Sequence, residues 1–129
     1  MTPELAALAA TALLQIVLTM VAQTAFTKDV GRDGNMGPRD ELPPMSPKTR
    51  RMRRAIDNHV ENIGLFIIAV VLVSLTGKGS LFTAICAWIF VGARLVYFPA
   101  YARAWSPLRS YLYMIGLAAT LAMILTSFF

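Results

Sequence analysis

The sequence predicts an all-α integral membrane protein, a single domain (residues 1–129) in which four transmembrane helices form a bundle. The 129 residues are 57% hydrophobic and only 15% charged, which is more apolar surface than so short a soluble chain can bury in one core. Four apolar runs alternate with polar or Gly/Pro-rich stretches, and each run is long enough to cross a bilayer as a helix. Eight of the twelve basic residues lie between residues 28 and 54, as is typical of a cytoplasmic loop between membrane spans.

The first span is predicted over about residues 5–26, and a polar loop follows over residues 28–47. The chain starts with MTPEL, which lacks the basic residues of a cleaved signal peptide, so we expect the first apolar run to be retained as a helix. The loop contains three of the eight glycines and four of the seven prolines. This composition disfavours a long helix and predicts turns and extended segments.

Three further spans are predicted over about residues 56–75, 81–98 and 108–129. Ser46 and Pro47 are typical of an N-cap followed by proline in the first helical turn, so the second helix should begin in water near Lys48 and reach the membrane at about residue 56. Residues 76–80 are enough only for a turn that reverses the chain direction. Pro99 should kink or end the third helix. Because the loops after the first and third spans carry most of the basic residues, both termini should lie on the non-cytoplasmic side.

Polar side chains within the predicted helices share single faces near the cytoplasmic ends of the spans. At about 100° per residue, one stripe of the second helix contains Arg51, Arg54, Asn58 and Glu61. The third and fourth helices contribute similar faces, with Arg94, Tyr97 and Tyr101 on one and Arg109 and Tyr113 on the other. Ionised side chains are costly in lipid, so these faces should meet one another or a hydrated cavity.

Two interpretations of these faces follow from the residue types. An ion pair between Glu61 and Arg94 would link two helices, since each charge removes the burial cost of the other. The arginines outnumber the carboxylates, however, and arginine is suited to bidentate binding of carboxylates. An anionic ligand is therefore the second interpretation, and the two roles are compatible.

Two other residues that could carry chemistry are expected to have structural roles. His59 is expected at the membrane interface, and Cys86 is expected to be an inert packing group. No further ligands accompany either residue, so no metal site is predicted. The basic block matches no nucleic-acid-binding fold, which excludes nucleic acid as a partner, and the sequence contains neither hydrolase nor phosphate-loop motifs.

Two segments resemble the MAPEG superfamily, the membrane-associated proteins of eicosanoid and glutathione metabolism. The first segment, RMRRAIDNHVENIGLF, matches through Arg51, Arg54, Ala55, Asn58 and Glu61. The second, ARLVYFPAYARAWSPLRSYLY, matches through Arg94, Tyr101, Pro107, Arg109, Ser110 and Tyr113. The resemblance covers about residue 38 to the C-terminus, and the stretch GPRDELPP is similar to bacterial members.

This resemblance implies a homotrimer of four-helix subunits in the bacterial inner membrane, with glutathione bound as cosubstrate between neighbouring protomers near the cytoplasmic side. It implies a transferase or peroxidase acting on lipophilic electrophiles or hydroperoxides, with membrane lipids and a lipophilic small molecule as further partners. Arg109 would stabilise the glutathione thiolate, with Ser110 beside it. The implied glutathione-binding residues are Arg51, Arg54, Asn58, Glu61, Arg94, Tyr97, Tyr101 and Tyr113.

The sequence departs from the family pattern at three points, and two of them, Asp57 and Tyr97, motivate an alternative. Asp57 occupies a position where members often have a basic residue, Tyr97 occupies one where some have histidine, and the spacing from Tyr101 to Arg109 is one residue short. The alternative is a non-enzymatic membrane bundle that binds a lipid or another anionic ligand.

Overall fold

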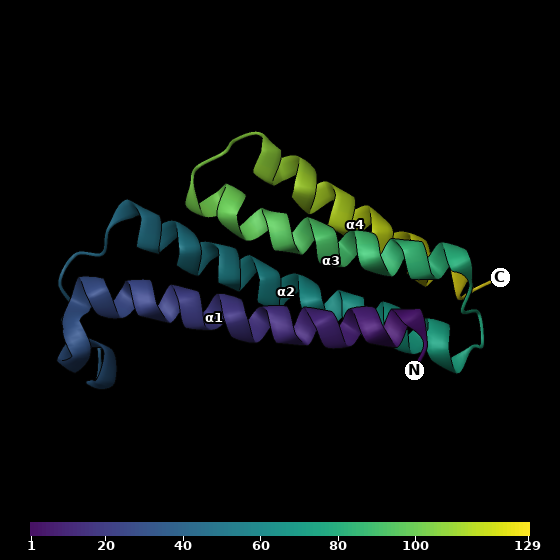
Figure 1. Ribbon diagram of the computed structural model, residues 1–129, viewed down its shortest axis with the longest axis horizontal. Helices are drawn as coiled ribbons and strands as arrows, with labels where there is room; N and C mark the ends of the chain where they lie inside the picture. The colour runs from purple at the N-terminus through teal and green to yellow at the C-terminus, as the bar shows by residue number, and fades with distance from the viewer.

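The computed structural model describes all 129 residues and contains four α-helices and no strand. The helices are α1 (Pro3–Met36), α2 (Pro47–Leu75), α3 (Leu81–Ala102) and α4 (Leu108–Thr126) (Figure 1). All four are long and apolar enough to span a membrane. The predicted fold class, an all-α membrane four-helix bundle, is therefore confirmed.

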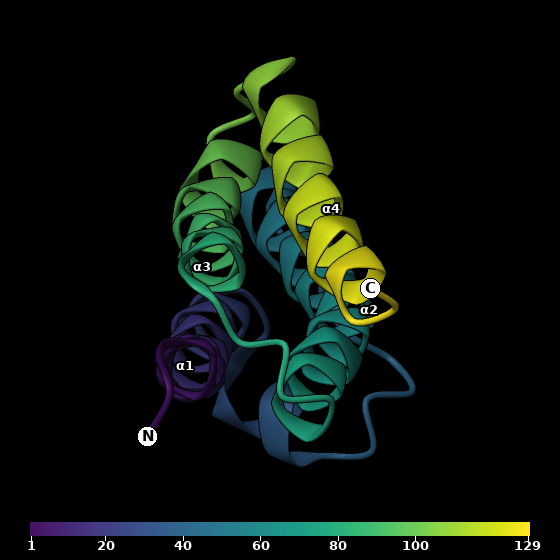
Figure 2. The ribbon, with the colours of Figure 1, turned by 90° about the vertical axis from the view of Figure 1, so that its right-hand side faces the viewer.

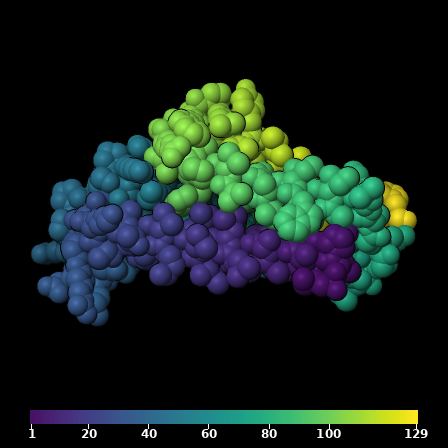
Figure 3. Space-filling view, viewed as in Figure 1, coloured from purple at the N-terminus to yellow at the C-terminus, as the bar shows by residue number.

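The helices run antiparallel to their chain neighbours, and both termini lie at the same end of the bundle (Figure 1). Viewed along the bundle, α1 and α2 form one layer and α3 and α4 the other (Figure 2). Helix α2 packs against each of the other three helices, whereas α1 packs against α2 and α3 but not α4. In the space-filling view, α1 forms the lower front face and α3 lies above it (Figure 3).

The core consists of aromatic and small side chains where the helices cross. The rings of Phe66 and Phe90 stack with centroids 4.0 Å apart and an interplanar angle of 8°. Small residues around them bring the helix backbones close together, and these are Ala7, Ala69, Ala87 and Ala119. Cys86 also lies in this cluster, as expected for a packing group.

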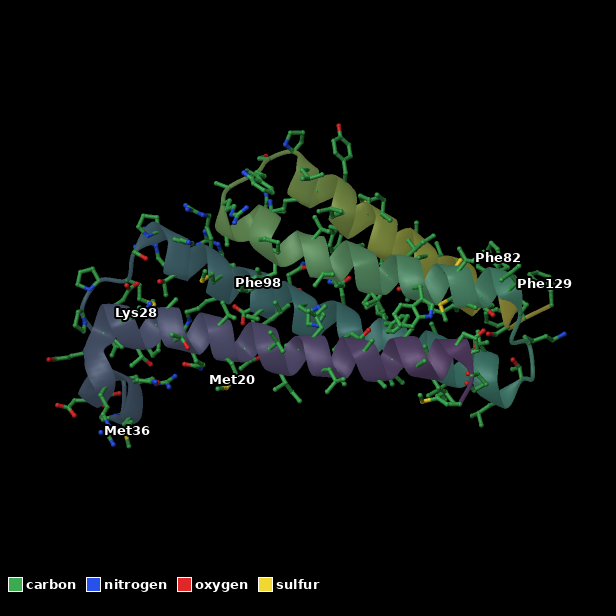
Figure 4. The ribbon with its side chains drawn as sticks, in the orientation of Figure 1. Met20, Lys28, Met36, Phe82, Phe98 and Phe129 are labelled. Carbon is green, nitrogen blue, oxygen red and sulfur yellow. The ribbon has the colours of Figure 1, made fainter.

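Most apolar side chains lie on the outside of the bundle. Only 30 of the 129 residues are buried. Met20 and Phe82 are 64% and 55% exposed and lie on the outer surface (Figure 4). Such a surface is unfavourable in water but matches a lipid solvent.

Two predicted helix ends are wrong. Helix α1 continues beyond residue 26 to Val30, has a kink at Gly31 with non-helical backbone angles (φ 78°, ψ 167°), and resumes as a short helical stretch that ends at Met36, so only residues 37–46 form an irregular connector. Glycine adopts this positive φ without strain, and Phe26 and Val30 before the kink are packed (1% and 7% exposed). Helix α3 likewise continues past Pro99 to Ala102, which places Tyr101 on a helix instead of in a loop.

The start of α2 is confirmed as predicted, with Ser46 as N-cap and Pro47 in the first turn. The Ser46 side chain accepts a hydrogen bond from the Thr49 backbone (3.2 Å). Asp29 of α1, which lies beyond the apolar run, accepts the Ser46 backbone N–H (2.8 Å). Hydrogen bonds from the Thr49 hydroxyl and from Ser46 hold the pKa of Asp29 below its usual value. This contact fixes the C-terminal part of α1 to the start of α2.

At the opposite end, Thr83→Val should destabilise the protein. The Thr83 hydroxyl donates to Glu4 (2.6 Å) and accepts the Ser80 backbone N–H (2.8 Å), and Glu4 is only 2% exposed. Thr83→Val removes the hydrogen bond that Thr83 donates to the buried Glu4 carboxylate, which should cost about 1–3 kcal/mol. Thermal unfolding in detergent measures the effect. The control is Thr24→Val, whose exposed hydroxyl bonds only within its own helix; equal melting temperatures for the two variants would contradict the prediction.

Candidate functional site

Three arginines meet around Tyr101 at the end of the bundle opposite the two termini, where α2 and α4 begin and α3 ends. The Arg51 Nε donates to the Ala102 carbonyl (3.0 Å), and the Arg54 Nε donates to the Tyr101 hydroxyl (3.2 Å). The guanidinium carbon of Arg109 lies 4.6 Å from the centre of the Tyr101 ring, and that of Arg54 lies 5.8 Å from it. Cation–π contacts of this kind hold the guanidinium groups in place.

These groups line a cavity of about 280 Å³, which we call the arginine pocket. Its lining residues are Arg51, Arg54, Tyr101, Ala104, Ser106 and Arg109. None of them is acidic, so three positive charges share one small space without a carboxylate in its lining. Such an arrangement attracts anions and suits bidentate binding of carboxylates.

The structure therefore brings together four of the predicted site residues: Arg51, Arg54, Tyr101 and Arg109. It adds Ala104 and Ser106 from the α3–α4 connection, which the sequence analysis missed. Ala104 has a φ of 59°, a conformation that is rare outside glycine. A small residue and a serine in a loop have no distinctive pattern, and only their position between Tyr101 and Arg109 could have indicated them.

Arg94 does not reach the arginine pocket. It is 1% exposed and lies inside the bundle, where its Nη1 donates to the Asn58 Oδ1 (2.9 Å). Its guanidinium carbon lies 5.2 to 5.8 Å from the centres of three aromatic rings, those of Tyr97, Phe90 and Tyr113.

The predicted ion pair between Glu61 and Arg94 is wrong within one chain. Glu61 is exposed on α2, and the remaining guanidinium nitrogens of Arg94 have no protein partner. Three residues of helix turn a side chain about 60° from its starting direction. Asn58 therefore faces α3, and Glu61 points away from it.

The other predicted residues do not line the arginine pocket, although the Tyr97 ring contacts the Tyr101 ring edge to face, with centroids 5.7 Å apart. Tyr97 is 4% exposed and packs with Ala55, Tyr113 is half-buried, and Ser110 is exposed and does not line the pocket. His59 is 1% exposed, so it lies inside the bundle, and its predicted position at the membrane interface stays a prediction. The burial of His59 depends on how the neighbouring helices pack around α2, which the sequence alone does not give.

One protein family matches almost the whole chain. The model of the MAPEG family matches residues 4–129. No curated protein matches the chain in a sequence search. The family match, the four membrane-spanning helices and the order of the two motifs agree, and the chain is thus an integral membrane protein that belongs to the MAPEG family.

Proposed function

We propose that this protein is a glutathione-dependent membrane transferase or peroxidase that acts on lipophilic electrophiles or hydroperoxides. Members of the MAPEG family are glutathione-related transferases and peroxidases or their relatives. The observation that carries the proposal is the arginine pocket, in which three arginines face one cavity with no acidic residue in its lining. Glutathione carries two carboxylates and a thiol, which matches this excess of positive charge.

In this proposal Arg109 stabilises the thiolate, and Arg51 and Arg54 bind the carboxylates. A thiol with a pKa near 8.5 is mostly protonated at neutral pH. A guanidinium close to the sulfur in a partly desolvated site favours the thiolate, which is the nucleophile. The Tyr101 ring holds the Arg109 guanidinium in position. Ser110 follows Arg109 in the first turn of α4 and is proposed to assist it.

The outer face of α2 supports an assembly in which a second copy completes the site. Asp57 and Glu61 are exposed there, one turn apart, and a Cβ built on Gly64 would meet no atom within 4 Å. An ionised carboxylate that faces lipid costs free energy. We therefore propose that another copy covers this face in a homotrimer. The remaining stripe residues Asn58 and Glu61 would then line the glutathione site between copies.

The basic residues near the start of α2 support a cytoplasmic location for the arginine pocket. Both termini lie at the other end of the bundle (Figure 1) and would face away from the cytoplasm. The GPRDELPP stretch supports a bacterial inner membrane as the location.

Titration of the detergent-purified protein with glutathione tests the proposal. Binding should produce the ultraviolet absorbance band of a thiolate at neutral pH, together with turnover of a lipophilic model electrophile. No band and no turnover at millimolar glutathione would contradict it. In that case, fatty acid or lipid that copurifies and is identified by mass spectrometry would support a non-enzymatic bundle that binds an anionic lipid.

A further inference from the structure

A second cavity, a groove of about 480 Å³ between α1 and α2, shares no lining residue with the arginine pocket. Its lining includes Lys28 and Lys48, which are two of the three lysines of the chain, and we call it the lysine groove. Both lysines are exposed, and no carboxylate pairs with either of them. The one acidic residue of the lining, Asp29, instead accepts the backbone N–H of Ser46 (2.8 Å).

The rest of the lysine groove is largely apolar. Met20, Val21 and Met52 line it, and Met20 and Val21 are 64% and 43% exposed. Met20 and Lys28 lie eight residues apart on α1 (Figure 4), which is about 12 Å along a helix. The headgroup layer on each side of a bilayer is only about 5–7 Å thick, so a groove of this length reaches from the headgroups into the hydrocarbon.

The lysine groove and the face that we assign to a second copy lie on opposite sides of α2. Met52 and Glu61 are nine residues apart, which places them about 180° apart around the helix at about 100° per residue. All the residues that line the groove belong to α1 and α2, and these two helices extend beyond α3 and α4 at this end of the bundle (Figure 1). A second copy on the face of Asp57 and Glu61 therefore leaves the groove open to lipid.

The charges of the lysine groove determine which lipid suits it. A lysine ammonium group binds a phosphate as a compact point charge, and anionic lipids attract basic residues at the membrane surface. A zwitterionic headgroup also contains a cation, which two lysines would repel. Because two lysines face a single carboxylate, that of Asp29, the lining favours a headgroup with a net negative charge.

We propose that the lysine groove binds one anionic phospholipid. Its phosphate lies between Lys28 and Lys48, and one acyl chain lies along Met20 and Met52. The bound lipid thereby connects α1 and α2 beside the hydrogen bond between Asp29 and Ser46. This site is separate from the arginine pocket, and it does not depend on the proposed glutathione reaction.

Native mass spectrometry of the full chain, taken from bicelles with equal amounts of phosphatidylglycerol and phosphatidylcholine, tests the site. The wild type should retain one lipid per chain, with at least a tenfold preference for phosphatidylglycerol. The double variant Lys28→Gln/Lys48→Gln should retain the two lipids about equally, since each basic residue near an anionic lipid accounts for about fivefold in affinity. No retained lipid, or no preference in the wild type, would overturn the proposal.

The matched control is the double variant Arg32→Gln/Arg50→Gln. It removes the same charge from the same two helices, but both arginines are exposed and neither lines the lysine groove. The preference for phosphatidylglycerol should stay within about twofold of the wild type, because screened charges outside the site have small effects. Equal losses in the two double variants would show that net positive charge selects the lipid, and the groove would then have no specific role.

The acyl-chain part of the site is tested without any change of charge. Ala25→Trp fills the lysine groove, which Ala25 lines, and should lower lipid retention at least fivefold. Leu13→Trp, at a 65% exposed position of α1 outside the groove, should leave retention unchanged. Retention that survives Ala25→Trp, or that inorganic phosphate at 50 mM abolishes, would mean that the lysines bind only a phosphate, and the proposal would fail.

Arg109→Ala tells this site from the arginine pocket. The variant should retain phosphatidylglycerol as the wild type does, because Arg109 does not line the lysine groove. Loss of the lipid in Arg109→Ala would place it in the arginine pocket and would overturn the proposal. Absence of glutathione binding in the wild type would contradict the proposed function alone, and the lipid would still be retained.

Discussion

Arg109→Ala is expected to lower glutathione-dependent turnover by roughly 100- to 1,000-fold, the usual effect of removing one group that stabilises a developing or stored negative charge. The Arg109 guanidinium contacts the Tyr101 ring and lines the arginine pocket. Without it the bound thiol should remain protonated at neutral pH. The measurement is kcat with a lipophilic model electrophile, together with the thiolate absorbance band, which should disappear.

The matched control for this prediction is Arg103→Ala. Arg103 has the same charge and lies six residues earlier in the chain, but it is exposed, contacts the Trp105 ring (5.1 Å) and does not line the arginine pocket. Turnover and the thiolate band should therefore stay within about threefold of the wild type, because screened surface charges have small effects. Equal losses in the two variants would show that net positive charge, and not the position of Arg109, controls the reaction.

Phe90→Ala should cause a large loss of stability. Phe90 is 1% exposed, stacks on Phe66 and lies 5.3 Å from the Arg94 guanidinium carbon. Truncation of phenylalanine in a water-soluble core costs about 3–5 kcal/mol. In lipid the transfer contribution is small because the solvent is itself apolar, so we expect a loss of about 2 kcal/mol from the cavity and the lost contacts.

Reversible unfolding in mixed detergent measures this loss, with Phe82→Ala as control. Phe82 lies on the same helix, but it is 55% exposed (Figure 4). Its truncation should change the free energy of unfolding by less than about 0.5 kcal/mol. A similar loss in both variants would indicate that the outer face of α3 is packed against protein and not against lipid.

The number of helices and their approximate positions were predictable from sequence because a membrane span needs a minimum length of apolar chain. The helix ends were less predictable. Gly31 interrupts the helical conformation at a kink but a further helical stretch follows it to Met36, and Pro99 lies inside α3 without ending it. Packing of neighbouring side chains such as Val30 and Ala100 outweighs the local preference, and that packing is a tertiary effect.

The site was predictable to the extent that helix periodicity defines it. Periodicity places Arg51 and Arg54 on one face, and the structure adds Tyr101 and Arg109 from the neighbouring helices. Periodicity does not give the rotation of one helix relative to the next, and a rotation of about 60° separates a residue that faces α3 from one that faces outward. The Glu61–Arg94 pair failed for this reason.

The position of Tyr101 between two guanidinium groups has a consequence for energetics. Like charges held close together repel each other, and the folded state bears this repulsion because the Tyr101 ring and the Ala102 carbonyl keep the arginines in place. An anion bound in the arginine pocket would relieve this repulsion, so occupancy of the pocket and stability of this end of the bundle would be thermodynamically linked. The arginines that would bind the ligand thus destabilise the folded state by mutual repulsion as long as no anion is bound.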